Sequence, residues 1–200
     1  MADEPRIVSL GAYGDVDFFS FKGVVETLLG VMRIENPRFE AETANPSYHP
    51  GRCARVYAGD TLIGVFGQVH PLVAGRYGVD CDLYTAELMF EALLECQGAE
   101  PVYVPLPRFP SITRDIAVVC DCTVTVAQLS DAIYSSGGQY LKKCELFDVY
   151  TGTGIPQGKK SVAFSLTMRA EDQTLTDEHA GECVSAILAA LEKNCGAVIR

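Results

Sequence analysis

The sequence predicts an α+β protein of two parts joined by a proline-rich segment. The composition, 48% hydrophobic and 21% charged over 200 residues, is typical of a folded globular chain. Four prolines lie between residues 101 and 110, where neither a central strand nor a helix interior tolerates them. Beyond them, strand-like and helix-like segments follow one another in a regular order. We therefore expect a first part over residues 1–100, a linker over 101–109 and a second part over 107–200.

The first part begins with an amphipathic helix over residues 17–32. Its apolar residues recur at spacings of three, four and seven, and Asp17 is a suitable N-cap. Prolines interrupt residues 33–50, which we expect to be mostly loop with one short strand. Residues 52–69 predict a β-hairpin that turns at Gly59-Asp60. A strand over residues 83–88 and a short helix over 90–96 complete this part.

The second part has a clearer pattern. It predicts a strand (112–120), a helix (125–136), two strands (141–150 and 160–169), a second helix (176–194) and a last short strand (197–200). The order β-α-β-β-α-β is that of a ferredoxin-like sandwich, in which both helices cover one face of a four-stranded antiparallel sheet. The other face of the sheet is left open.

Alternation along the strands assigns side chains to the open face. The large apolar residues of 160–169 must face the helices, which leaves Ser161, Ala163, Ser165 and Thr167 on the other side. On the preceding strand, Phe147 and Val149 are expected to face the helices, so Asp148 and Tyr150 point outward. An exposed aromatic ring among small side chains suits a stacked nucleobase.

We therefore predict an RNA-binding surface. It offers an aromatic ring at Tyr150, a hydrogen-bond acceptor at Asp148 and a hydroxyl at Ser161. Lysines near these residues would attract phosphates. The cations in this prediction are Lys142, Lys143, Lys159 and Lys160.

The overall charge opposes this prediction, but its distribution does not. The net charge of −10 argues against a nucleic-acid partner. Residues 1–106 hold 15 acidic and 7 basic side chains, which gives −8, and residues 107–200 hold 11 and 9, which gives −2. Residues 140–170 contain five basic side chains and only two acidic ones. A local field matters more than the total charge for the docking of a polyanion.

Other composition features exclude several classes of protein. No apolar run approaches the roughly 18 residues of a membrane-spanning helix, and the first residues do not resemble an export signal. Eight cysteines without C-x-x-C spacing predict reduced, mostly buried thiols in the cytoplasm and no metal site. The turn at 152–161 resembles a phosphate-binding loop, but the strand–turn–strand context and the residue after Lys159 do not fit one.

Seven motifs, in this order, carry a resemblance to a known family. They are DFFxxKG from Asp17, HPGRxA from His49, GxxGxxHP from Gly64, FPxxxRDIA from Phe109, LFDVYxG from Leu146, GKKSxA from Gly158 and TLTD from Thr174. Together they resemble the C-terminal quarter of the bacterial phenylalanyl-tRNA synthetase beta subunit. The resemblance implies a ferredoxin-fold anticodon-binding domain over 107–200, preceded by a partial class II synthetase-like antiparallel α+β domain without catalytic residues.

The resemblance also implies partners and limits. In that family the residues at the positions of Asp148, Tyr150 and Ser161 meet the anticodon of phenylalanine tRNA. The resemblance thus implies that Tyr150 stacks on a base, that Asp148 accepts a hydrogen bond from a base edge and that Ser161 donates or accepts one. The family uses ATP and Mg²⁺, is a tetramer of two alpha and two beta subunits, and carries catalysis in the alpha subunit. A beta subunit is several times longer than 200 residues, so we expect this chain to be a fragment with no catalytic residues and no cofactor or metal of its own. We expect no partner DNA and no membrane.

Two alternatives stay open at this point. The second part could be a pure assembly module that docks on protein and never touches RNA, which the net charge favours. It could instead be a small acyl-phosphate hydrolase, a reaction for which this fold is also used. That chemistry needs an arginine and an asparagine at a phosphate cradle, and the asparagines, Asn36, Asn45 and Asn194, do not lie in glycine-rich loops.

Overall fold

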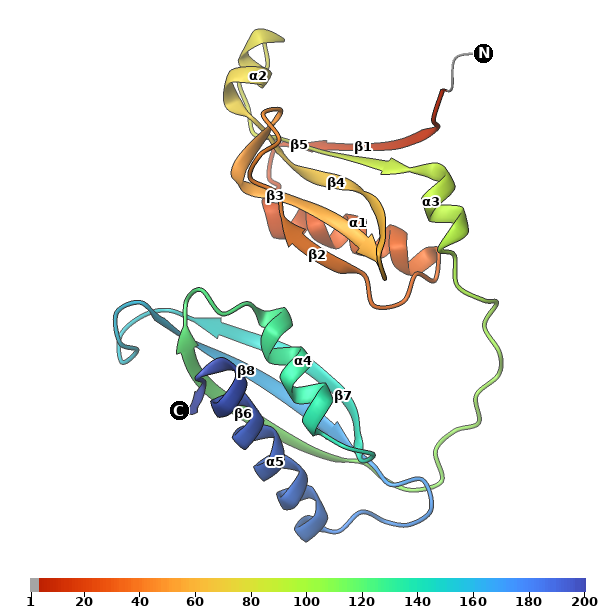
Figure 1. Ribbon diagram of the computed structural model, residues 1–200, viewed down its shortest axis with the longest axis vertical. Coiled ribbons are helices and arrows are strands. Elements are labelled where there is room, and N and C mark those ends of the chain that lie inside the picture. The colour runs from red at the N-terminus through yellow and green to blue at the C-terminus, as the bar shows by residue number, and fades with distance from the viewer. Residues whose placement is uncertain (1–3) are drawn as a thin grey trace. The chain divides into compact units, whose positions relative to one another are not determined.

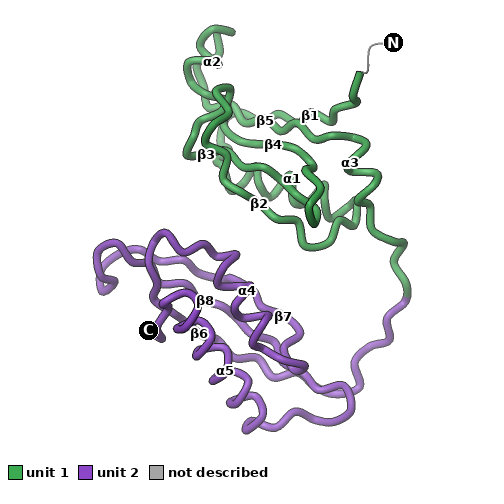
Figure 2. The backbone as a smooth tube through the Cα atoms, in the orientation of Figure 1, with its two compact units in different colours: residues 1–102 green, residues 103–200 purple. Residues whose placement is uncertain are grey.

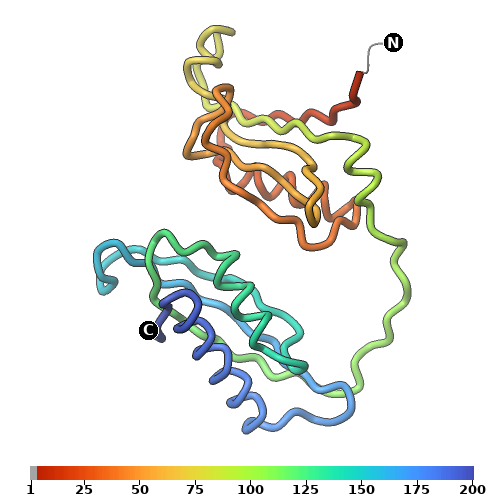
Figure 3. The backbone as a smooth tube through the Cα atoms, viewed as in Figure 1, coloured from red at the N-terminus to blue at the C-terminus, as the bar shows by residue number. Residues whose placement is uncertain are grey.

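The computed structural model describes residues 4–200 and divides the chain into two compact units. Unit 1 spans residues 1–102 and unit 2 spans residues 103–200 (Figure 2). Each unit is folded from one continuous stretch of chain, as the colour gradient in Figure 3 shows. Residues 97–111 contain neither helix nor strand, in keeping with the prolines there.

Unit 1 is an antiparallel α+β structure. Its five strands run in the order β1-β5-β4-β3-β2, and α1 covers one face of the sheet (Figure 1). In chain order the elements are β1 (Ile7–Tyr13), α1 (Phe18–Val31), β2 (Arg38–Ala41), β3 (Tyr48–Ala58), β4 (Thr61–Val69), α2 (Pro71–Arg76), β5 (Leu83–Met89) and α3 (Phe90–Glu95). The predicted helix, hairpin and later strand are confirmed, whereas β1 and α2 were not predicted. β1 is an edge strand in which Val8, Leu10 and Ala12 pack against the core of unit 1. Its exposed face also carries large apolar residues, Ile7 and Tyr13, which obscure the alternation in the sequence.

The core of unit 1 lies between α1 and the sheet. Phe21, Val25 and Leu29 are spaced by four residues and are almost fully buried. The ring of Phe18 stacks on that of Phe66 in β4 at 5.3 Å between centroids. Asp17 is the N-cap of α1, as predicted, because its carboxylate accepts the Ser20 N–H at 2.7 Å.

Two glycines of β4 allow close contact with the neighbouring strands. A Cβ at Gly64 would overlap the carbonyl oxygen of Glu87 in β5, and one at Gly67 would overlap that of Arg52 in β3. The G-x-x-G spacing in β4 is therefore a packing requirement of the central strand.

Unit 2 has the predicted β-α-β-β-α-β order. Its elements are β6 (Ile112–Asp121), α4 (Val126–Ser136), β7 (Leu141–Tyr150), β8 (Lys159–Met168), α5 (Asp177–Cys195) and β9 (Val198–Ile199). The antiparallel sheet has the strand order β7-β8-β6-β9, and α4 and α5 lie on the same face of it (Figure 1). This is the ferredoxin-like sandwich that the sequence predicts.

The core of unit 2 confirms the alternation along β8. Val162, Phe164, Leu166 and Met168 are all fully buried beneath the helices. Both helices are well capped: Thr125 and Gln128 form a capping box at the start of α4, and Gly196 ends α5 in the left-handed conformation at φ 59°. No helix within residues 4–200 has the length and apolar character needed to cross a bilayer.

The cysteines are partly, not uniformly, buried. Cys53, Cys120 and Cys183 are buried as expected, but Cys81 and Cys122 are exposed. Burial raises the pKa of the Cys53 thiol to about 11 and that of Cys144 to about 11. These thiols are protonated at neutral pH and behave as small apolar side chains.

We predict that Gly64→Ala destabilises unit 1 by about 1–3 kcal/mol, because the new methyl group overlaps the backbone of β5. The measurement is urea denaturation followed by far-UV circular dichroism. Gly23→Ala in α1 is the matched control: nothing lies within 4 Å of its added Cβ, so it should stabilise the chain by about 0.5–1 kcal/mol. Equal stability of the Gly64→Ala and wild-type chains would show that β4 and β5 do not pack this closely.

We predict a graded reaction of the thiols with a disulfide reagent at pH 8. Cys81 and Cys122 should react first because they are exposed. Cys53 and Cys144 should react slowly, since at a pKa of about 11 only about one thiol in a thousand is ionised. Mass spectrometry locates the modified residues, and all eight should react in urea. The assignment fails if Cys53 reacts in the folded chain as fast as Cys81.

Candidate nucleic-acid interface

The open face of the unit 2 sheet is defined by the strand register. Tyr150 of β7 lies opposite Ser161 of β8, which lies opposite Val119 of β6. In the next row, Asp148 lies opposite Ala163. Side chains directly opposite in an antiparallel pair share a face. Val162 and Phe164 of β8 face the helices, so the rows of Ser161 and Ala163 lie on the side away from α4 and α5.

Tyr150 points outward, as predicted, and its ring is held in place by the following turn. The side chain is 38% exposed. Its hydroxyl donates to the carbonyl oxygen of Thr153 at 3.4 Å, and a Cβ at Gly152 would lie only 2.5 Å from that hydroxyl. The Tyr150 ring can therefore occupy this position only because residue 152 has no side chain. A half-exposed aromatic ring with a fixed orientation is what base stacking requires.

The structure corrects the expectation for Ser161. The residue is on the open face by register, but it is only 3% exposed. β8 is a central strand, so Ser161 is flanked on both sides by larger side chains, Tyr150 and Val119. Its hydroxyl belongs to the floor of the surface and is not freely accessible.

The structure also corrects the orientation of Phe147. The register shifts between Leu146 and Asp148, so Phe147 is the extra residue of a β-bulge and has no partner on β8. Leu146, opposite Phe164, occupies the helix-facing position that was expected for Phe147. Phe147 itself is 58% exposed. Asp148 and Tyr150 still face outward because Val149 pairs with Val162 on the helix side.

Two of the four predicted lysines lie away from Tyr150 and are engaged in ion pairs. Lys143 pairs with Thr167 and Tyr150 with Ser161, six positions apart along β8, which is about 20 Å at a strand rise of about 3.3 Å per residue. Its Nζ lies 2.7 Å from Glu145, and that of Lys142 lies 2.9 Å from Glu171. The hydrogen bond from Lys142 holds the pKa of the Glu171 carboxyl below its usual value. These lysines lie at the end of the sheet that is distant from Tyr150.

The other two lysines lie at the Tyr150 end but on opposite faces. Lys160 is opposite Cys120, a core residue, and so is on the helix side. Lys159 is opposite Asp121 on the open side. Among residues 4–200, no carboxylate oxygen lies within 4 Å of the Nζ of either lysine. Of the predicted residues, the structure thus places Asp148, Tyr150, Ser161 and Lys159 on the open face, in three successive rows at one end of the sheet.

Sequence reasoning missed a further cation on this surface. The guanidinium carbon of Arg200 lies 5.8 Å from the centroid of the Tyr150 ring. The two residues are fifty positions apart and on strands at opposite edges of the sheet. Only the strand order β7-β8-β6-β9 and the face assignment of β9 could have predicted this contact.

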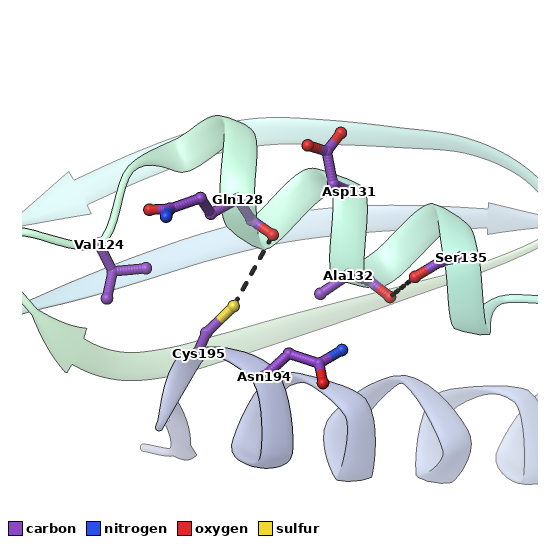
Figure 4. A pocket seen from close by; sticks show the side chains of 7 residues that line it. All are labelled: Val124, Gln128, Asp131, Ala132, Ser135, Asn194 and Cys195. Atoms are coloured by element: carbon purple, nitrogen blue, oxygen red, sulfur yellow. Dashed lines mark hydrogen bonds between the residues drawn. The ribbon is translucent and has the colours of Figure 1, made fainter.

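The helix side of unit 2 contains a cleft that does not suit phosphate chemistry. The cleft, of about 490 Å³, lies between α4 and α5 and includes Asn194 (Figure 4). Its other lining residues are Val124, Gln128, Asp131, Ala132, Ser135 and Cys195. The only charged group in this lining is the Asp131 carboxylate, which would repel a phosphate. The arginine that an acyl-phosphate hydrolase needs is thus not part of this cleft.

Metal and nucleotide sites find no support in the part of the chain that the structure describes. No group of three or more His, Cys, Asp or Glu side chains there could hold a metal ion. The turn from Gly152 to Ser161 joins β7 to β8, two strands, whereas a phosphate-binding loop precedes a helix.

Comparisons with known proteins agree with this architecture. Residues 107–200 match the family described as "Ferredoxin-fold anticodon binding domain", and residues 2–90 match the "Phenylalanyl tRNA synthetase beta chain CLM domain". The first match contains all of β6 to β9 and both helices of unit 2. The second contains the sheet of unit 1.

Three relatives show how far the similarity extends. The chain is 39% identical over 197 residues to the phenylalanine–tRNA ligase beta subunit of Clostridium acetobutylicum, covering 98% of this chain and 25% of the relative. It is 43% identical to that of Bacillus subtilis, covering 92% and 23%. It is 40% identical to that of Symbiobacterium thermophilum, covering 100% and 24%. The chain spans about a quarter of the length of these relatives, and it belongs to the phenylalanine–tRNA ligase beta subunit family.

Proposed function

We propose that residues 107–200 bind the anticodon arm of phenylalanine tRNA on the open face of the sheet β7-β8-β6-β9. The observation that carries this proposal is the Tyr150 ring, which is half-exposed and held over Gly152 beside Asp148. The ring supplies a stacking platform, worth about 1–3 kcal/mol per base. The Asp148 carboxylate supplies an acceptor for the amino or imino groups of a base edge.

The small side chains of β8 form the part of the open face next to the ring. Ala163 and Ser161 lie beside Asp148 and Tyr150 in their rows, so a base on the ring can approach the sheet closely. Ser161 contributes chiefly as a small floor residue, because its hydroxyl is buried. A larger residue there would fill the space next to the ring.

The cations divide into two classes in this proposal. Lys159 faces the open side near Tyr150 and is available to a phosphate, whereas Lys142 and Lys143 are held by Glu171 and Glu145. Lys160 lies on the helix side and would reach RNA only around the edge of the sheet. Lys159 is therefore the lysine that should contribute to the salt dependence of binding.

Unit 1 has a different role in this proposal. Its match to the beta chain domain supports a scaffold that contacts the alpha subunit in the assembled cytoplasmic enzyme, a tetramer of two alpha and two beta subunits. Attachment of phenylalanine to its tRNA, with ATP and Mg²⁺, would take place elsewhere in that assembly. We expect no aminoacylation by residues 1–200 alone.

We predict that Tyr150→Ala weakens binding of the phenylalanine anticodon stem–loop by about 5- to 150-fold, because it removes the stacking platform. The measurement is fluorescence anisotropy with the full 200-residue chain at low and moderate salt. Tyr150→Phe is the matched control: it keeps the ring and loses only the hydrogen bond to Thr153, so its affinity should stay within about twofold of wild type.

A stem–loop with a scrambled anticodon loop distinguishes this function from an assembly module. The proposal requires the native loop to bind more tightly than the scrambled one. Equal binding of both at every salt concentration, with no effect of Tyr150→Ala, would instead favour a module that docks only on protein. The exposed apolar side chains of β7, Leu146, Phe147 and Val149, would then be its contact surface.

We predict unequal effects for two lysine substitutions that remove the same charge. Lys159→Ala should weaken binding and reduce the slope of log affinity against log salt by up to about 0.7, as expected for one lost phosphate contact on a single strand. Lys143→Ala, about 20 Å from Tyr150 along the sheet and paired with Glu145, should leave that slope unchanged. A larger effect of Lys143→Ala than of Lys159→Ala would indicate that the RNA binds at the other end of the sheet.

A further inference from the structure

The backbone of Arg200 extends the edge strand β9. Val198 pairs with Val119 and Ile199 with Val118, and the Arg200 N–H donates to the carbonyl oxygen of Ala117 at 2.9 Å. Val119 is on the open face and Val118 is in the core, so the next alternation puts Arg200 on the open face. Arg200 therefore lies on the same surface as Tyr150.

The row between Arg200 and the β7 edge consists of small residues. Ala117 of β6 pairs with Ala163 of β8, which pairs with Asp148 of β7. Two alanines in succession place no large side chain between Arg200 and β7 in this row. The Arg200 side chain extends toward β7, and its guanidinium carbon lies 5.8 Å from the centroid of the Tyr150 ring. This separation is within the range of a cation–π interaction.

The guanidinium forms no ion pair within the described part of the chain. Among residues 4–200, no carboxylate oxygen lies within 4 Å of its nitrogens. The lysines at the other end of the sheet are ion-paired, and a lysine has no planar group with which to stack on a base. Arg200 is thus the cation best suited to contact a base at the Tyr150 ring.

We propose that Arg200 and Tyr150 form a clamp for one nucleobase, with the ring on one face of the base and the guanidinium on the other. This inference rests on the proposed RNA-binding function. A base between two stacked planes separates them by two van der Waals contact distances of about 3.5 Å each, about 7 Å in all. The present 5.8 Å is about 1 Å shorter, a difference that rotation about the side-chain bonds of an exposed arginine can supply. In the free protein the guanidinium rests near the ring, and in the complex it closes over the base.

The test uses Arg200→Ala and Arg200→Lys in the full chain, with the phenylalanine anticodon stem–loop as the probe. Arg200→Ala should weaken binding by about 5- to 30-fold, as expected for loss of a cation–π contact that becomes desolvated on binding. Arg200→Lys keeps the charge but not the planar group, so it should remain at least about threefold weaker than wild type. Lys193→Ala, which removes one charge from the helix side of the same unit, is the control and should stay within about twofold.

A double substitution tests whether the two residues act on the same base. In the Tyr150→Ala background, Arg200→Ala should have little further effect, because neither half of a clamp functions without the other. Fully additive losses would overturn the clamp, and so would Arg200→Lys binding as tightly as wild type or Arg200→Ala binding equally or more tightly. If native and scrambled loops bind alike and Tyr150→Ala changes nothing, the proposed function itself fails. If Tyr150→Ala weakens binding and Arg200→Ala does not, only the clamp fails.

Discussion

The burial of one face of β8 beneath α4 and α5 is the constraint on which the rest of unit 2 depends. Phe164 and Leu166 lie within the core, and the period of two along a strand then forces Ser161 and Ala163 to the other side. Because Tyr150 pairs with Ser161 beyond the bulge in β7, the same constraint turns Tyr150 outward. A shift of one residue would exchange the two faces and abolish both the core and the candidate RNA surface.

The features that the sequence could predict are those that depend on local periodicity. The element order of unit 2, the helix-facing residues of β8 and the outward direction of Tyr150 follow from alternation and capping signals within single segments. Asp17 at the start of α1 is a similar case, since one side chain satisfies a backbone group three residues away. Motif resemblance added the family, which periodicity alone does not identify.

The features that the sequence could not predict depend on neighbours distant in the chain. The burial of Ser161 follows from the central position of β8, and the exposure of Phe147 follows from a bulge that only pairing with β8 reveals. The pairing of Lys142 with Glu171 brings together residues that are 29 positions apart. Counting lysines near a motif therefore overestimated the positive charge around Tyr150, and Arg200 was overlooked because its place beside that ring depends on the order of four strands.

The net charge of −10 for the whole chain does not describe the charge near Tyr150. Most of the excess negative charge belongs to residues 1–106, and a polyanion bound to unit 2 experiences chiefly the groups within about one Debye length, roughly 8–10 Å. On the open face at the Tyr150 end these include Lys159 and Arg200 as well as Asp121 and Asp148. Such a surface attracts RNA only weakly at long range, so specific contacts must supply most of the affinity.

Groups that would contact RNA are already held in position in the free protein, which offsets the weak long-range attraction. The Tyr150 ring already rests over Gly152, and the backbone of Arg200 is already fixed by its hydrogen bond to Ala117. Fixing a side chain on binding costs about 0.5–1.5 kcal/mol, and little of that cost remains for a ring held before the RNA arrives. Changes that loosen the ring, as an added side chain at Gly152 would, should therefore weaken binding even though they remove no contact with RNA. The open face is thus a surface whose affinity depends on rigid placement of a few groups more than on its charge.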